Sequence, residues 1–187
     1  MYGLGVVNGT GDGGLSEAGA FDENSEKDVY GRLAVKLGGM SISGDGESPP
    51  GGEPWEDNSL TIGASAYRGW PESGSFLRYG GDLQLRYSGL DLFGAVLAGE
   101  DNVAESDDPE FLAWFVEADQ VILPWLIAIA RYGNVEGRGP GAAADSQDLL
   151  LAINASIRPN LVLRLESLTY LEGEAGDRAR LRLDVVY

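Results

Sequence analysis

Apolar and polar residues alternate along most of this chain with a period of two. In the C-terminal segment, Ala179, Leu181 and Leu183 take every second position, and Arg180, Arg182 and Asp184 lie between them. Successive side chains of a strand point to opposite faces, so this pattern predicts a β-strand with one apolar and one charged face. The same test predicts ten strands in all: Tyr2–Asn8, Val29–Leu37, Leu60–Ala66, Leu77–Tyr87, Leu90–Gly99, Phe111–Val121, Trp125–Tyr132, Asp148–Ile157, Leu161–Tyr170 and Ala179–Tyr187.

One region is open to a competing interpretation. Apolar residues are dense from Phe111 to Tyr132, and a short apolar run fits a buried helix as well as a strand. Pro124 would interrupt that helix, and Glu117 and Asp119 flank Ala118 in an alternating pattern. We therefore expect two strands in this region.

The connections between the predicted strands alternate between long and tight. Ser88–Gly89, Ile122–Pro124 and Arg158–Asn160 are tight, whereas Gly9–Lys27, Glu100–Glu110 and Gly133–Gln147 are long. A transmembrane β-barrel has tight turns at one membrane surface and longer loops at the other. Gly38–Ser59 breaks the rule because it is long on the tight-turn side, and the sequence offers no reason for this insertion.

The expected fold class is all-β: an antiparallel up-and-down transmembrane β-barrel with about ten strands, forming a single domain over residues 1–187. Strands of ten or eleven residues tilted by about 40–45° would cross an apolar band of about 25 Å. Aromatic residues lie mostly near strand ends, where they would form girdles at the two membrane surfaces: Tyr67, Trp70, Tyr79, Tyr87, Trp114, Trp125, Tyr132, Tyr170 and Tyr187. A soluble barrel with the apolar face inside would show the same period.

The polar positions of the strands carry charges of both signs. Facing lipid, such a side chain would cost about 2–4 kcal/mol at the membrane centre, so we expect these residues to face a wet lumen. The predicted pore-lining residues are Arg32, Lys36, Arg78, Asp82, Arg86, Glu117, Asp119, Arg131, Arg164, Glu166, Arg178, Arg180, Arg182 and Asp184. The arginines would provide a track for anions, or the mixed charges would hydrate the wall and pair across strands.

Composition removes many kinds of chemistry. The chain has 30 acidic against 13 basic residues, a net charge of -17, and neither His nor Cys. It therefore has no nucleophile activated by histidine and no thiolate or imidazole metal site, and we expect no enzyme activity and no cofactor. The negative charge disfavours nucleic acid as a partner. Much of the excess acid falls in the predicted connections, which would repel anions at the mouth of a pore.

Two local motifs suggest ligand sites, but the sequence around them does not support either site. Residues 9–14 match G-x-G-x-x-G, but no amphipathic helix follows them and Asp12 would repel a pyrophosphate. Asp101, Asp107 and Asp108 offer carboxylates for Ca²⁺ without the spacing of a calcium-binding loop, so a solvated surface loop is the favoured interpretation.

Several segments resemble the later strands of Gram-negative outer-membrane porins, particularly those related to phosphate-selective porins. The resemblance lies in Tyr2–Gly11, Lys27–Ala34, Leu60–Gly69, Arg78–Leu85 and the last strand, Arg180–Tyr187. It implies a last strand that the outer-membrane insertion machinery reads, although Tyr187 stands where most such proteins have Phe. Barrels of that family have about sixteen strands, which implies that this chain is the C-terminal part of a larger barrel; a complete ten-stranded barrel is also allowed. The first residues lack the basic and apolar stretches of a signal peptide, so we expect either that the signal was removed or that the chain begins within a longer protein.

The expected function is passive diffusion of small hydrophilic solutes or ions through a porin or channel in the bacterial outer membrane. Membrane lipid, lipopolysaccharide and further copies of the chain, for instance in a trimer, would be its partners. A barrel that sheathes or docks a partner such as a redox cytochrome is one alternative. A soluble ligand-binding β-barrel is another.

Overall fold

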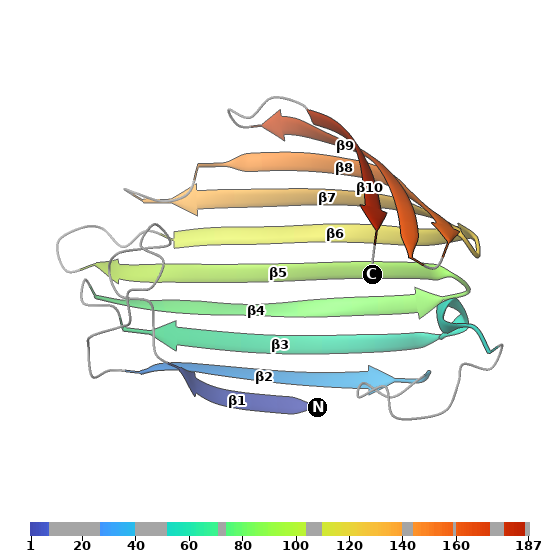
Figure 1. Ribbon diagram of the computed structural model, residues 1–187. Coiled ribbons are helices and arrows are strands. Elements are labelled where there is room, and N and C mark those ends of the chain that lie inside the picture. Colours follow the sequence, from blue (N-terminus) through green and yellow to red (C-terminus); the bar gives the residue numbers. More distant parts are fainter. Residues whose placement is uncertain are drawn as a thin grey trace.

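Ten antiparallel strands form one sheet in the computed structural model, and each strand pairs with its neighbours in the chain (Figure 1). The structure describes residues 1–7, 27–39, 52–70, 74–103, 110–139, 144–158, 160–172 and 178–185. The strands are β1 (Tyr2–Val7), β2 (Asp28–Leu37), β3 (Ser59–Gly69), β4 (Gly74–Tyr87), β5 (Leu90–Val103), β6 (Glu110–Leu123), β7 (Leu126–Arg138), β8 (Ser146–Arg158), β9 (Leu161–Glu172) and β10 (Arg178–Val185).

All ten segments expected from the alternating pattern are strands, and the up-and-down order is confirmed. The helical interpretation of the region around Pro124 is wrong. That proline lies in the turn between β6 and β7, where its missing N–H removes no ladder hydrogen bond. The two flanking strands pair along most of their length, with one bulge between Val121 and Leu123.

Tight turns occur at one end of the sheet. Ser88 and Gly89 connect β4 to β5 with φ angles of 49° and 81°. Two consecutive positive φ values define the primed turn whose twist matches that of the flanking strands, and glycine adopts the second of them without strain. The short connections from β6 to β7 and from β8 to β9 lie at the same end, on the right in Figure 1.

The long connection between β2 and β3 also lies at the tight-turn end. It contains a short 3-10 helix, η2 (Pro54–Glu56), which is tied to the neighbouring turn. The backbone N–H of Gly89 donates to the carbonyl of Trp55 at 3.0 Å, and the N–H of Ser88 donates to Oδ1 of Asn58 at 3.0 Å. The described part of this connection therefore packs against the edge of the sheet.

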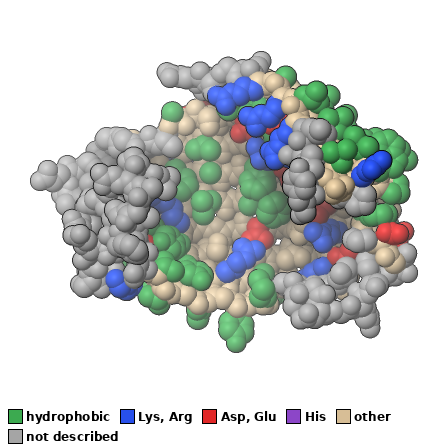
Figure 2. Space-filling view, viewed as in Figure 1, with side chains coloured by type: hydrophobic (Ala, Val, Ile, Leu, Met, Phe, Trp, Pro, Cys, Tyr) green, Lys and Arg blue, Asp and Glu red, His purple; other side chains and the backbone are tan. Residues whose placement is uncertain are grey.

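The sheet is strongly curved, so that β9 and β10 lie in front of the face seen in Figure 1. That face is hollow, and basic and acidic side chains gather in the hollow (Figure 2). The outermost strands are β1 and β10, and the strand order of the described residues includes no pairing between these two edges. Within the described residues, no helix is long and apolar enough to cross a membrane.

The apolar face of the sheet is the convex one, and nothing in the described chain covers it. Ala34 and Ala152 are the only buried hydrophobic side chains among the described residues. Large hydrophobic side chains are exposed instead along the convex face: Leu4, Leu33, Val35, Ile62, Tyr79, Leu83, Leu85, Tyr87, Val96, Leu112, Val116, Leu151, Ile153, Leu165 and Leu181. This arrangement inverts that of a soluble sheet, whose apolar face packs on a core.

Candidate functional site on the concave face

The backbone register places thirteen of the fourteen predicted pore-lining positions, all but Asp184, on the concave face. Directly paired residues of neighbouring strands project to the same side, which allows a face to be followed across the sheet. One row runs from Lys36 through Gln84 and Glu117 to Arg131, and on to Arg178 of β10. The next row joins Arg86, Asp119, Glu166 and Arg180 in the same way.

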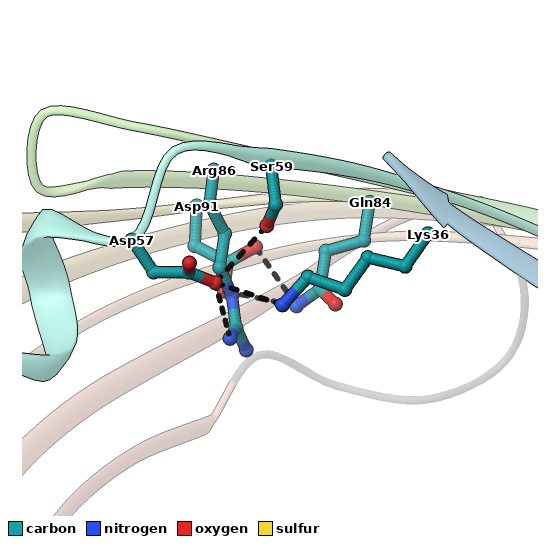
Figure 3. A network of polar contacts seen from close by, with 6 residues as sticks. All are labelled: Lys36, Asp57, Ser59, Gln84, Arg86 and Asp91. Atoms are coloured by element: carbon teal, nitrogen blue, oxygen red, sulfur yellow. Dashed lines mark hydrogen bonds and ion pairs between the residues drawn. The ribbon is translucent and has the colours of Figure 1, made fainter. Parts of the chain in front are cut away.

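A buried aspartate organises the concave face at the tight-turn end (Figure 3). Asp57, which is 1% exposed, accepts hydrogen bonds on Oδ2 from Nζ of Lys36 at 2.9 Å and from Oγ of Ser59 at 3.1 Å. Nη1 of Arg86 lies 3.8 Å from the same oxygen. The carboxylate thus fastens the connection after η2 to β2, β3 and β4.

Asp91 extends this network to β5. Nε of Arg86 donates to Oδ2 of Asp91 at 2.9 Å, and Nε2 of Gln84 lies 3.0 and 2.9 Å from the two carboxylate oxygens (Figure 3). Charged partners make these hydrogen bonds stronger than neutral ones. We name Lys36, Asp57, Ser59, Gln84, Arg86 and Asp91 the Asp57 network. The sequence pointed to two of its charges, Lys36 and Arg86, but Asp57 was missed because it lies in the unexplained insertion.

A bidentate ion pair crosses the middle of the same region. Nη1 and Nη2 of Arg32 donate to the two carboxylate oxygens of Asp82 at 2.7 and 2.9 Å. The pair spans from β2 to β4 over Gly63 of β3, where a side chain would collide with both partners. Glycine at this position therefore lets two residues that are not on adjacent strands meet.

Arg78 is enclosed near the opposite end of the strands. Its guanidinium lies 5.0 Å from the ring centre of Phe76 and 4.9 Å from that of Phe111, and it pairs with Asp101. Nη1 also donates to the carbonyls of Leu77 and Glu100. A guanidinium held between two rings and an aspartate has a structural role in the wall.

Acidic residues adjoin one another on β5 and β6. Asp91 is directly opposite Asp119, and Glu117 lies two residues away on the same face. The oxygen Oδ1 of Asp119 is buried without a hydrogen-bond partner, as is Oδ1 of Asp148, which lies 3.7 Å from Nη2 of Arg131. No group of three or more potential metal ligands occurs in the part of the chain that the structure describes.

Arginines line the concave face of the last two strands. Arg182 is paired in register with Arg164, and Arg180 with Glu166. Nε of Arg164 donates to Oδ1 of Asn154 at 2.9 Å. The ion pairs of the described residues include neither Arg164 nor Arg178 nor Arg180, so these cations differ from those of β2–β4.

The concave face is less polar than we expected. Phe93 and Phe115 meet edge to face with ring centres 5.3 Å apart, and Leu97 is 41% exposed beside them. Leu150 and Leu168 form a second apolar pair on β8 and β9. The alternation of apolar and polar residues is therefore incomplete on β5–β9, where runs such as Leu149–Leu151 place leucine on both faces.

The predicted aromatic girdles are divided between the two faces. Tyr67 and Tyr170 lie on the concave face, opposite Arg78 and Asp148, so they do not belong to a lipid-facing girdle. The hydroxyl of Tyr67 instead donates to the buried carboxylate of Asp28. Five of the others remain outside that face: Tyr79, Tyr87, Trp114 and Tyr132 on the convex face and Trp125 in an exposed turn.

Several sequence-based expectations lie outside the described residues. These include the G-x-G-x-x-G segment at 9–14, the loop carboxylates of Asp107 and Asp108, and the terminal Tyr187. For Asp184 the structure gives a backbone pairing with Val162.

The fold and the concave face define an all-β protein with one curled, antiparallel, up-and-down sheet of ten strands and a charged hollow side. No protein-family model, curated protein or solved structure matches the chain.

Proposed function

We propose that this chain forms the wall of a porin-type β-barrel in the bacterial outer membrane and lets small hydrophilic solutes or ions diffuse through its lumen. The observation that carries the proposal is the exposed apolar convex face opposite a charged concave face. Water penalises exposed apolar area by about 25 cal/mol per Å², whereas lipid does not. In lipid, the exposed apolar convex face would carry no such penalty, and the charged face would line a wet lumen.

The convex face also has an apolar band with aromatic residues at its two ends. Along β4, Tyr79 and Tyr87 are the exposed aromatic residues on either side of Leu83 and Leu85. Eight residues at a rise of about 3.3 Å separate them by about 26 Å along the strand, which is about 20 Å along the membrane normal at a tilt of about 40–45°. Beyond Tyr79, the convex face becomes polar with Glu100, Glu110, Glu136 and Arg138. This pattern supports an apolar band bounded by aromatic and polar residues.

A lipid location has a further consequence for the edges of the sheet. Unpaired backbone groups cannot face hydrocarbon, because no water is present to bind them. We therefore propose that β1 and β10 are covered in the membrane, by pairing with each other or with further strands of a larger barrel. Lipid and lipopolysaccharide would contact the convex face, and further copies of the chain could assemble around it. The proposal includes no catalytic step.

Planar-bilayer recording of the refolded, detergent-purified protein tests the proposal. We expect stepwise conductance from preparations in which the unheated protein migrates as a compact, heat-modifiable band. A compact barrel that conducts no ions and co-purifies with a protein partner would overturn the proposal in favour of a sheath. A protein that folds and stays monodisperse without detergent would overturn the membrane location and favour a soluble barrel.

A further inference from the structure

We infer that the concave face of β8–β10 favours organic anions that carry an apolar body, such as aromatic carboxylates, over inorganic anions and short carboxylates. This inference names a solute class for the pore and rests on the proposed function. Its basis is the difference between the two halves of the concave wall. One half neutralises its own cations, whereas the other combines leucines with two arginines, Arg178 and Arg180, that form no ion pair within the described residues.

The cations of β2–β4 are not available to a solute. Each Lys or Arg on the concave face of these strands contacts a carboxylate: Arg32 with Asp82, Lys36 with Asp57, Arg78 with Asp101, and Arg86 with Asp57 and Asp91. An anion entering here would have to displace a bound carboxylate. This half of the wall therefore offers little selectivity.

Arg178 and Arg180 differ in their surroundings. Both side chains are exposed on β10, and no carboxylate of the described residues lies within 4.0 Å of either guanidinium. Glu166 is opposite Arg180 in register but does not form an ion pair with it. Guanidinium groups bind carboxylates through two parallel N–H donors, so an incoming organic acid would supply the missing partner.

Leucines adjoin these arginines on the same face. Arg178 is directly opposite Leu168 of β9, which is directly opposite Leu150 of β8. Side chains so paired have Cβ atoms about 4.5–5.5 Å apart, and strands are about 4.8 Å apart. A molecule with its carboxylate at Arg178 would reach both leucines within about 10 Å, the span of a small aryl carboxylate.

The apolar neighbours decide between kinds of anion. Chloride or phosphate would bind the arginines but would gain nothing from the leucines. An aromatic ring would remove apolar surface from water on both the ligand and the wall, so we expect benzoate to be favoured over acetate by about tenfold.

Ion permeation provides the first test. Reversal potentials across planar bilayers, with sodium acetate on one side and sodium benzoate on the other, would give the permeability ratio. The wild type should favour benzoate. Two double variants should remove this preference. One combines Arg178→Gln with Arg180→Gln, and the other combines Leu150→Asn with Leu168→Asn. Matched controls, Arg138→Gln on the convex face and Leu97→Asn on the concave face of β5, should retain it.

Folding of each variant is checked by its heat-modifiable band. If the double variant Leu150→Asn with Leu168→Asn does not fold, the double variant Leu150→Ala with Leu168→Ala takes its place. Equal permeability of acetate and benzoate in conducting wild-type channels would overturn the inference and leave the proposed function standing. A loss of preference in the controls as large as in the test variants would also overturn it.

A second measurement separates the inference from the proposed function. Saturation-transfer NMR of sodium benzoate with the folded protein in lipid nanodiscs does not depend on conductance. A benzoate signal that falls in both test variants would support the site even if no current flows, in which case only the proposed function fails. No difference between wild type and test variants would overturn the site, as would a protein partner that covers Leu150 and Leu168 in a purified complex.

Discussion

Asp57 shows how one side chain can fix a connection to the sheet. It is almost inaccessible, and its carboxylate is shared by Lys36, Ser59 and Arg86. Lys36 is itself only 11% exposed, so Asp57 rather than water compensates its charge. Breaking a buried pair by removing one partner is costly, because the other charge stays uncompensated.

Replacing Asp57 by Asn should therefore lower the free energy of unfolding by about 3 kcal/mol. The matched control is Asp82→Asn, whose partner Arg32 is 41% exposed and can be solvated, and its cost should stay below about 1 kcal/mol. The measurement is the urea concentration at which the heat-modifiable band disappears. Equal effects of the two variants would contradict the role assigned to burial at Asp57. Adding Lys36→Met to the Asp57 variant should restore part of the loss.

Gly80 illustrates a second constraint at the residue scale. A Cβ atom at this position would overlap the carbonyl oxygen of Val96 on β5, and backbone cannot move aside as a side chain can. We expect Gly80→Ala to reduce stability by about 1–3 kcal/mol. Gly94→Ala is the control, because its Cβ would lie at an ordinary 3.6 Å from the nearest atom. Thermal loss of the compact band measures both, and equal midpoints would contradict the prediction.

At the scale of elements, the two edge strands matter most. In lipid, the outer backbone groups of β1 and β10 need partners, and the curl of β9 and β10 brings the C-terminal strands around toward the front of the sheet (Figure 1). Because the chain contains no cysteine, engineered thiols report on one pair alone.

If β1 pairs with β10 in the membrane, Leu4→Cys combined with Leu181→Cys should cross-link through a short bismaleimide in lipid vesicles. Both positions lie on the convex face, so their side chains would project to the same side. Leu4→Cys combined with Leu112→Cys is the control, since Leu112 lies on β6 in the middle of the sheet. A gel shift for the first pair alone would support closure by these edges. Its absence in a folded, conducting protein would mean that other strands cover them.

At the scale of the whole molecule, the proposed function requires that the convex side of the sheet faces lipid. Ala64 and Ser65 are adjacent on β3 and project to opposite faces. Arginine at a lipid-facing position costs about 2–4 kcal/mol near the membrane centre, whereas the lumen tolerates charge. Ala64→Arg should therefore reduce the yield of compact protein in lipid vesicles by at least tenfold. Ser65→Arg should leave that yield near the wild-type level, and the opposite result would place the apolar face inside.

Much of the architecture was predictable because a strand records its two faces in consecutive residues. The alternation of Leu181 with Arg180 and Arg182 requires no knowledge of distant contacts, and the same holds for Leu83 and Leu85. Pro124 and the pair Ser88–Gly89 likewise mark turns through their own backbone preferences. Strand number, strand order and the division of charges between faces followed from these local signals.

Partner choice required the tertiary structure. Which carboxylate meets which cation depends on register and curvature, so the sequence did not indicate that Asp57 crosses to Lys36 or that Arg78 lies between Phe76 and Phe111. The apolar patches on the concave face were also missed, because a run of consecutive apolar residues does not indicate which of them lie on which face. The sequence by itself thus determined the strands and their faces, which are local properties. Only the tertiary structure decided which of the described charges neutralise one another, because those pairs form across strands.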